Sequence, residues 1–323
     1  IYLGFLSSHR VSTNAPLIQG EGDQAISRAE IFSDNRTLTV DLEINANKAN
    51  SARINQNPTK SQREILGALQ VIYFSPEDLD LVRGEPTQRR DFLDKLLITR
   101  TPRLAGVISD YDRVVRQRNT LLKTRAPESS LVPWTEQLIS LGAQLTAERI
   151  SLVEKLNPYV AAHYAKLNEV KAASIAYKSS TDGLTTNIDS NIATLTRKQI
   201  EVAHNESERG VSLIGPHRDD LHLHLGDFPA KGYASHGESW SMAIALRIGS
   251  FTLLRDEGSS PILILDDIFA ELDTARRAQL VAITHLAEQT FITAAVESDL
   301  PADLVTQRFY VTPGKVSREA GVL

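Results

Sequence analysis

The chain contains the stretch Pro261-Ile262-Leu263-Ile264-Leu265-Asp266-Asp267. Four consecutive aliphatic residues after a proline are typical of a strand that is buried on both faces, as in parallel sheets. Two carboxylates follow where this strand should end, which is the edge at which open α/β sheets bind ligands. Because burying an unpaired carboxylate costs several kcal/mol, acids at this position need a cation or hydrogen-bond donors. The stretch therefore predicts an α/β fold with a ligand site at the end of this strand.

Two interpretations of these acids are open. In the first, Asp266 and Asp267 belong to a solvated turn after a buried strand. In the second, they are the acidic pair of a P-loop NTPase, in which the first acid holds Mg²⁺ and an acidic or polar neighbour orients the attacking water. Aliphatic runs followed by two aspartates are common, so this stretch alone does not decide between them.

A second feature, Ser235-His236-Gly237-Glu238, precedes the strand. Ser235 is a good helix N-cap and Glu238 completes a capping box, which is the simpler interpretation of this segment. Such a turn also offers free N–H groups and a helix dipole to an anion. ABC-type ATPases use a similar signature turn to hold the γ-phosphate of ATP bound to a partner subunit. Asp273 stands where their D-loop aspartate would lie.

The composition limits the classes of function. The chain has 323 residues, 41% of them hydrophobic, which is enough for one large domain or two lobes. It has no cysteine, which excludes disulfides, thiolate catalysis and Cys-ligated zinc and fits a reducing cytoplasm. No apolar run approaches the roughly 18–20 residues that cross a membrane. His222 and His224 alternate without a third ligand, so we interpret them as ordinary polar residues rather than a zinc pair.

The order of apolar patterns predicts two parts of the chain. Residues 25–44 alternate around Asp34-Asn35, which predicts an antiparallel hairpin. Helical spacing then dominates, and strand patterns return after Gly210 at 211–214 and 221–225. The helices are expected over 104–122, after Pro133 with a break or kink at Pro158, and over 188–203. We therefore predict a head of residues 1–80 and 205–323, with a helical lobe of residues 81–204 inserted in it.

The basic residues are concentrated in one segment. The net charge is -5, yet residues 83–125 hold eleven Lys/Arg against five Asp/Glu. Cations gathered in one groove can bind nucleic-acid phosphates even in an acidic chain, because salt confines each field to roughly 10 Å. For any single cation, a solvated helix face is the alternative. The candidate DNA contacts are Arg89, Arg90, Arg113, Arg116 and Lys123.

Several motifs together resemble the RecF family of bacterial recombination proteins, and the resemblance covers essentially the whole chain. The most specific motif is Gly215-Pro216-His217-Arg218-Asp219-Asp220-Leu221. The signature turn and the run from Leu265 to Asp273 follow it in the family order. Further matches are Ser8-His9-Arg10, Ala15-Pro16-Leu17, Pro76-Glu77-Asp78-Leu79, Arg89-Arg90-x-Phe92-Leu93-Asp94 and Arg118-Asn119-x-Leu121-Leu122-Lys123.

The resemblance implies an ABC-type P-loop NTPase head related to SMC and Rad50. Such a head has a mixed β-sheet, helices and an antiparallel β subdomain, and the family adds a helical lobe. The family binds ATP with Mg²⁺, binds double-stranded and gapped DNA, forms an ATP-dependent homodimer and hydrolyses ATP slowly. With RecO and RecR it helps to load RecA at gaps in the DNA of the nucleoid. One alternative is an SMC-like structural head that acts by dimerisation, although residues 81–204 are too short and interrupted for coiled-coil arms. Another is a fragment that folds but binds no nucleotide.

The same resemblance implies roles for individual residues. Asp266 should contact Mg²⁺, directly or through water, and Asp267 should position the hydrolytic water. Asp273 should act across the dimer. The residues expected to face the partner's γ-phosphate are Ser235, Gly237 and Glu238. Gln70 and the turn up to Glu77 stand where related heads have their Q-loop.

The sequence departs from the family pattern at two places. The Gly-rich Walker A loop is absent, since the Lys-Ser/Thr pairs at Lys60, Lys123 and Lys178 have no preceding glycine. The chain begins in an apolar run without an initiating Met, so we expect the first strand and the P-loop to lie outside this sequence. Without the Walker A lysine, the chain should bind ATP poorly. Thr293-Ala294-Ala295-Val296 stands where many ABC proteins have a switch histidine, which leaves the γ-phosphate sensor unidentified and predicts slow hydrolysis.

Overall fold

A computed structural model describes residues 1–323 except 9, 12, 21, 34–35, 169, 302–303, 305–306 and 319–323. Its three-stranded parallel sheet has the order β10-β9-β5, with β5 at Val71–Phe74, β9 at Ile262–Asp266 and β10 at Thr290–Thr293. The register pairs Phe74 with Leu265 and Thr293 with Asp266, so the carboxyl ends of the strands meet at one edge. The predicted strand is confirmed, and its two aspartates come at the end of the central strand.

The prediction that this strand is buried on both faces is wrong. Leu263 and Leu265 are fully buried in the main hydrophobic cluster, but Ile262 and Ile264 are partly exposed. Ile264 packs on a small cluster that contains Phe5, from the short helix α1 (Tyr2–Phe5). That cluster is too small to cover the second face completely, so the four aliphatics alternate in burial.

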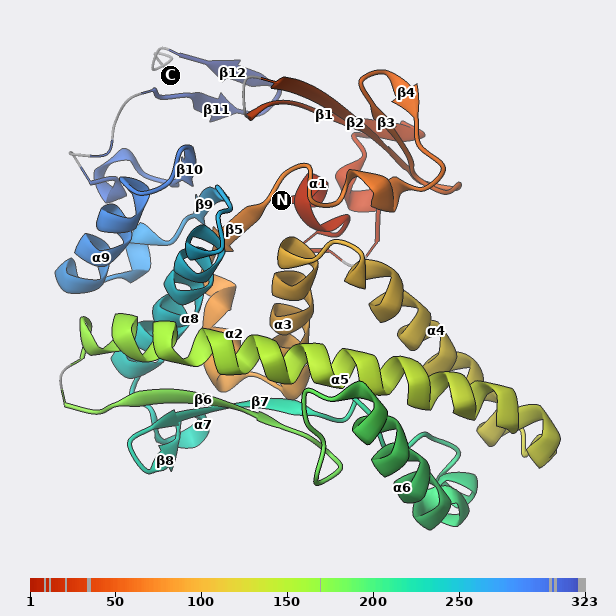
Figure 1. Ribbon diagram of the computed structural model, residues 1–323. Coiled ribbons are helices and arrows are strands. Elements are labelled where there is room, and N and C mark those ends of the chain that lie inside the picture. Colours follow the sequence, from red (N-terminus) through yellow and green to blue (C-terminus); the bar gives the residue numbers. More distant parts are fainter. Residues whose placement is uncertain are drawn as a thin grey trace.

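An antiparallel sheet with the order β1-β2-β3-β4 occupies the top of Figure 1. Strands β1 (Gln24–Ser33) and β2 (Arg36–Asn45) form the predicted hairpin, and β3 (Ser51–Ile54) and β4 (Asn57–Pro58) extend it. The predicted turn at Asp34-Asn35 lies outside the described residues. This sheet has a hydrophobic cluster of its own, which consists of Val40, Leu42, Ile44, Ala52 and Ile65.

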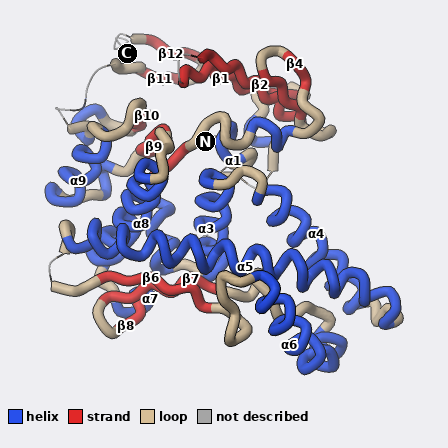
Figure 2. Tube along the Cα trace, in the orientation of Figure 1, coloured by secondary structure: helices blue, strands red, loops and turns tan. Residues whose placement is uncertain are grey.

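Helices fill the middle of the molecule (Figure 2). Those expected from the sequence are present as α4 (Leu104–Lys123), α5 (Glu128–Ala165) and α6 (Ile188–Arg209). Helix α5 continues through Pro158 instead of breaking there. A proline in a helix interior loses a hydrogen bond and crowds the preceding turn, but Leu156, Val160 and Tyr164 are fully buried, and this packing holds the helix together.

The segment 81–204 is not purely helical. It contains β6 (Ala173–Lys178), which pairs antiparallel with β7 (Asp220–Leu225), and β8 (Phe228–Pro229) completes that sheet. Both strands lie below α5 in Figure 1. The main hydrophobic cluster contains residues from both predicted parts, including Val114 of α4 and Leu246 of α8. The predicted strand at 211–214 is wrong, because this segment is irregular and is held by side chains.

Helix α8 (His236–Asp256) is the most completely buried helix beside the site, and it packs on both α5 and β5. The remaining helices are α2 (Leu79–Arg83), α3 (Pro86–Arg100), α7 (Ala230–Tyr233) and α9 (Thr274–Thr284). A hairpin of β11 (Tyr310–Thr312) and β12 (Lys315–Ser317) follows. Short 3₁₀ turns are η1 (Ala15–Leu17), η2 (Gln62–Ile65), η3 (Pro76–Asp78), η4 (Phe269–Glu271) and η5 (Glu297–Asp299). Within the described part of the chain, the helices lack the combined length and apolar character needed to span a bilayer.

Candidate functional site

Asp266 and Asp267, here called the acidic edge, lie where the parallel strands end. The carboxylate of Asp266 accepts a hydrogen bond from Thr293 Oγ1 at 2.6 Å through Oδ1. Its Oδ2 lies 2.7 Å from Nη2 of Arg10, and the side chain is 15% exposed. The parallel register sets the first contact, because Thr293 ends β10 beside Asp266. Asp266 is therefore oriented from both sides at the surface of the protein.

Asp267 turns the chain sharply after β9. Its φ is 54°, in the left-handed region that most residues avoid and that Asp and Asn tolerate. Its backbone N–H donates to the carbonyl and hydroxyl oxygens of Thr293, each at 3.1 Å, and its Oδ1 accepts from the N–H of Ala295 at 3.3 Å. Backbone held in this region by its surroundings is concentrated at functional sites. The turn places two successive carboxylates at the same edge.

The acidic edge suits Mg²⁺ that arrives with a nucleotide. Mg²⁺ in such sites takes one or two carboxylates, together with phosphate oxygens and water. Asp266, with the Thr293 hydroxyl beside it, is a donor set of this kind. The described residues include no group of three or more His, Asp or Glu that could hold a metal ion alone. His222 and His224 both lie on β7, where burial lowers the pKa of His222.

The residues Ser235–Glu238, here called the signature turn, begin α8. The predicted capping box is confirmed: Ser235 Oγ accepts from the N–H of Glu238 at 3.2 Å, and Glu238 Oε2 accepts from the N–H of Ser235 at 2.8 Å. Lys171 lies 2.7 Å from Glu238 Oε1. Lys171 and the Ser235 N–H together lower the pKa of Glu238 to about 2. Ser235 is exposed, so the turn opens toward solvent.

Asp273 caps the next helix instead of standing free. Its Oδ1 accepts from the N–H of Arg276 at 2.9 Å, and its Oδ2 accepts from the Arg276 guanidinium. The same guanidinium donates to the carbonyl oxygen of Gly237 at 2.7 Å. The structure thus connects Asp273 to the signature turn through Arg276, which the sequence did not single out.

The Q-loop candidate Gln70 lies away from the acidic edge. Gln70 precedes β5 and so stands at the amino end of the sheet, where its Nε2 donates to the carbonyl oxygen of Thr99 at 3.0 Å. The turn after β5 lies at the correct edge instead. In that turn Asp78 accepts from Arg247 of α8 at 2.6 and 3.1 Å, and both side chains are buried. This ion pair joins the end of β5 to the helix that carries the signature turn.

The five candidate DNA-binding residues differ in where they lie. Arg89 is 5% exposed and pairs with Asp220 at 2.7 Å, so a direct role for it in DNA contact does not fit the structure. Arg90 is half-buried and donates to the carbonyl oxygen of Asp219 at 3.0 Å. Arg113, Arg116 and Lys123 are exposed on α4.

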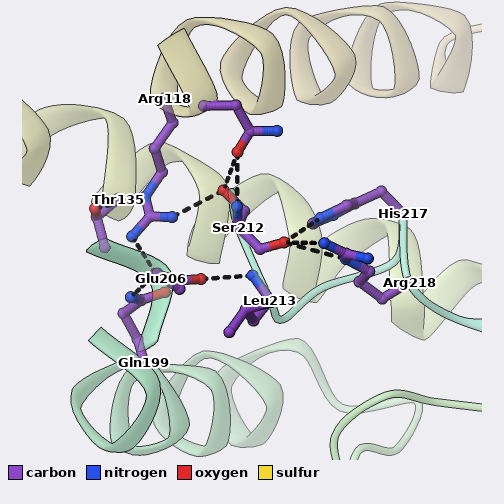
Figure 3. A network of polar contacts seen from close by, with 9 residues as sticks. Arg118, Thr135, Gln199, Glu206, Ser212, Leu213, His217 and Arg218 are labelled. Carbon is purple, nitrogen blue, oxygen red and sulfur yellow. Dashed lines mark hydrogen bonds and ion pairs between the residues drawn. The ribbon is translucent and has the colours of Figure 1, made fainter. Parts of the chain in front are cut away.

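The specific family motifs at 118–119 and 215–221 meet in a polar network with a buried centre, here called the polar lock (Figure 3). Its described members are Arg118, Asn119, Thr135, Gln199, Glu206, Ser212, Leu213, His217 and Arg218. Arg118 lies 2.6 Å from Glu206, and the two side chains are 3% and 0% exposed. Ser212 Oγ donates to Asn119 at 2.8 Å, and the carbonyl oxygen of Ser212 accepts from His217 at 3.2 Å. The polar lock therefore fastens the irregular segment after α6 to α4.

His217 is held as a neutral ring in this network. Its Nδ1 lies 2.7 Å from the hydroxyl of the buried Tyr111, and its Nε2 faces a carbonyl oxygen. The carbonyl can only accept, so Nε2 carries the proton and Nδ1 accepts from Tyr111. Burial lowers the pKa of His217 to about 4. These motif residues thus serve the packing of the helices rather than the acidic edge.

No family model matches the chain. It is 47% identical over 350 residues to the DNA replication and repair protein RecF of Rhodococcus erythropolis, a match that covers 98% of this chain and 86% of that protein. The RecF of Streptomyces avermitilis is 46% identical, with 98% and 88% covered. A solved structure of the recombination mediator protein RecF-ATPrS in the RecFOR pathway matches with a TM-score of 0.89 over 99% of this chain and 86% of that chain. At 22% identity that likeness shows the fold, which is the ABC-ATPase-like α/β head predicted from the sequence. Because 47% identity extends over nearly the whole chain, the chain belongs to the RecF family of DNA replication and repair proteins.

Proposed function

We propose that this protein is an ATP-dependent, DNA-binding recombinational repair protein that dimerises around ATP and hydrolyses it slowly. In this role it acts with RecO and RecR in the cytoplasm, at the nucleoid, to promote loading of RecA at gapped DNA. Membership of the RecF family and the relatives named as replication and repair proteins support the proposal. The observation that carries it is the acidic edge, with Asp266 held between Thr293 and Arg10 at the end of β9.

The proposal assigns the acidic edge to Mg²⁺-ATP. Asp266 would hold the ion, which when bound neutralises negative charge on the terminal phosphates. Asp267 would orient the attacking water, because its carboxylate is fixed by the Ala295 N–H beside Asp266. Thr293 begins the segment where a switch histidine is usual, and its hydroxyl already donates a hydrogen bond to Asp266. A hydroxyl is a weaker proton acceptor than an imidazole, which agrees with slow turnover.

The proposal assigns the signature turn to the γ-phosphate of ATP on a second subunit. The turn offers the N-terminus of a 21-residue helix, and Ser235 faces solvent. Helix N-termini favour anions through free N–H groups and the helix dipole. Glu238 does not cancel this preference, since Lys171 and the Ser235 N–H neutralise it. ATP between two such surfaces would join two heads.

The proposal places DNA on the exposed cations of α4. Arg113, Arg116 and Lys123 are exposed and can reach phosphates, Arg113 from a surface ion pair with Asp110. Such contacts give affinity with little sequence preference. The domain assignment is part of the same proposal: residues 1–80 and 205–323 form the ATPase head, and residues 81–204 form the lobe that carries the DNA contacts.

The test is Asp267→Asn in the full-length protein. Asn tolerates the left-handed conformation of residue 267 and its amide oxygen can still accept from Ala295, so the fold should be kept. We expect ATP and DNA binding to persist while DNA-stimulated ATP turnover falls about 100-fold. Asp227→Asn, at an exposed turn, is the matched control and should turn over ATP at the normal rate.

The outcome separates hydrolysis from the SMC-like alternative. Normal turnover in Asp267→Asn would remove the role assigned to this carboxylate. If the wild-type protein dimerises with ATP but has no turnover to lose, the alternative of a head that acts by dimerisation replaces the ATPase proposal.

A further inference from the structure

Arg276, in the first turn of α9, makes contacts that join the signature turn and Asp273. Its Nη2 donates to the carbonyl oxygen of Gly237 at 2.7 Å, and its Nε donates to Ser241 Oγ at 3.0 Å. Its Nη1 pairs with Asp273 Oδ2, while its backbone N–H donates to Oδ1 at 2.9 Å. All three guanidinium nitrogens therefore have acceptors, and these acceptors lie on two elements separated by β9.

The guanidinium geometry makes this contact hard to replace. Arginine presents its donors in a rigid planar fork, whereas a lysine ammonium is a single point on a flexible chain. The side chain of Arg276 is 17% exposed and Ser241 is fully buried. Arg276 thus reaches from the protein surface into the packed start of α8, and lysine cannot meet all three acceptors at once.

Gly237 is tied to the same side chain. A Cβ atom built at Gly237 would lie 2.8 Å from Nη2 of Arg276, which is closer than real Cβ contacts allow. The backbone of Gly237 is not in the left-handed region, so conformation does not require glycine here. A methyl group at position 237 would therefore displace Nη2, the mobile end of the Arg276 side chain, from its place beside the Gly237 carbonyl.

We propose that Arg276 is a positioning residue that holds the signature turn and Asp273 as one surface for the ATP-bearing partner. The inference rests on the proposed ATP-dependent dimer. Asp273 has both carboxylate oxygens bound and Gly237 has its carbonyl bound, so neither can move independently toward a partner. Holding both in place before binding lowers the ordering cost of dimerisation. Arg276 acts through these residues and need not touch ATP.

The experiment is a double-mutant cycle in the full-length protein, with Arg276→Ala, Gly237→Ala and both together. Sedimentation measures the protein concentration for half-dimerisation at saturating ATP, and nucleotide affinity is measured on dilute monomer. We expect Arg276→Ala and Gly237→Ala each to raise that concentration about tenfold, because each removes or displaces the same guanidinium. In the Arg276→Ala background, Gly237→Ala should add less than about twofold. Nucleotide affinity of the Arg276→Ala monomer should stay within about twofold of the wild type.

Arg276→Lys keeps the charge but not the fork, and it should rescue dimerisation only in part. Additive effects of Gly237→Ala in both backgrounds would show that its methyl group acts elsewhere, and would overturn this inference alone. This inference alone would also be overturned if Arg276→Ala dimerised normally. It would be overturned likewise if Arg276→Ala weakened nucleotide binding to the monomer as much as it weakened dimerisation. A wild-type protein that stays monomeric with ATP would overturn the proposed function and this inference with it.

Discussion

The polar lock and the acidic edge both contain residues of the family motifs, yet they use them in opposite ways. In the polar lock, Arg118 and Glu206 are almost fully buried and bind each other and their neighbours. At the acidic edge, Asp266 is oriented by Arg10 and Thr293 but remains at the surface. The first arrangement pairs its charged groups in the interior, whereas the second places its carboxylates at the surface, where the parallel strands end.

The difference teaches that a polar motif does not by itself identify a site. Buried polar groups need internal partners, so their loss damages the fold. Surface groups at the end of a strand can be changed with small effects on the fold and large effects on function. Substitutions in the two regions should therefore separate stability from activity, and the following predictions test that separation.

The largest effect on stability should come from Glu206→Gln. Removing one partner of a buried ion pair leaves Arg118 charged and unpaired, which should cost about 3–5 kcal/mol in the free energy of unfolding. Glu201 on the same helix provides the matched control, because its pair with Lys198 is exposed. Glu201→Gln should cost less than about 1 kcal/mol. Urea denaturation measures both, and equal costs would refute the distinction between lock and surface.

His217 should make the polar lock sensitive to acid. Its pKa in the folded protein is about 4, below the usual value of 6.5 for histidine, so the unfolded state binds more protons between these pH values. The stabilisation is complete above about pH 6.5 and is lost as the pH falls toward 4, by about 2–3 kcal/mol. Between pH 7 and pH 4.5, the free energy of unfolding should fall more in the wild type than in His217→Gln. Identical pH dependence in the two proteins would contradict the assignment of a neutral His217 ring in the folded state.

The arginines of residues 83–125 should likewise separate into some that affect DNA binding and others that affect stability. Replacing Arg113 and Arg116 by Gln should reduce the slope of log affinity for DNA against log salt by about 2, for all sequences equally. The unfolding free energy should change by less than about 1 kcal/mol, since both side chains are exposed. Arg89→Gln, as the contrasting variant, should destabilise the fold through Asp220. A sequence-dependent loss of DNA affinity would indicate base contacts instead.

Much of the local structure could be predicted from the sequence. The aliphatic run with its two aspartates, the capping box at Ser235 and the alternation of the hairpin are local signals, and each is confirmed. These features depend on residues close together in the chain, where periodicity and capping chemistry decide the conformation.

The contacts that complete the site could not be predicted in this way. Thr293 reaches Asp266 only because β10 pairs in parallel with β9. Arg10 comes from the other end of the chain, and Arg276 is one of two adjacent arginines that a sequence cannot tell apart. The excess of Lys and Arg in residues 83–125 also overestimates the exposed positive charge, because Arg89 and Arg118 are buried. Register and burial, rather than local pattern, set these positions.

The central claim is that ATP joins two heads through the signature turn. Sedimentation of the full-length protein, with and without ATP and Mg²⁺, tests it most directly when Ser235→Arg is compared with the wild type. Ser207→Arg, at an exposed position on α6, is the control. We expect ATP to convert the wild type and Ser207→Arg to dimers and to leave Ser235→Arg a folded monomer, destabilised by about 1 kcal/mol through its lost cap. Dimers of Ser235→Arg with ATP, or a wild type that stays monomeric, would contradict the claim.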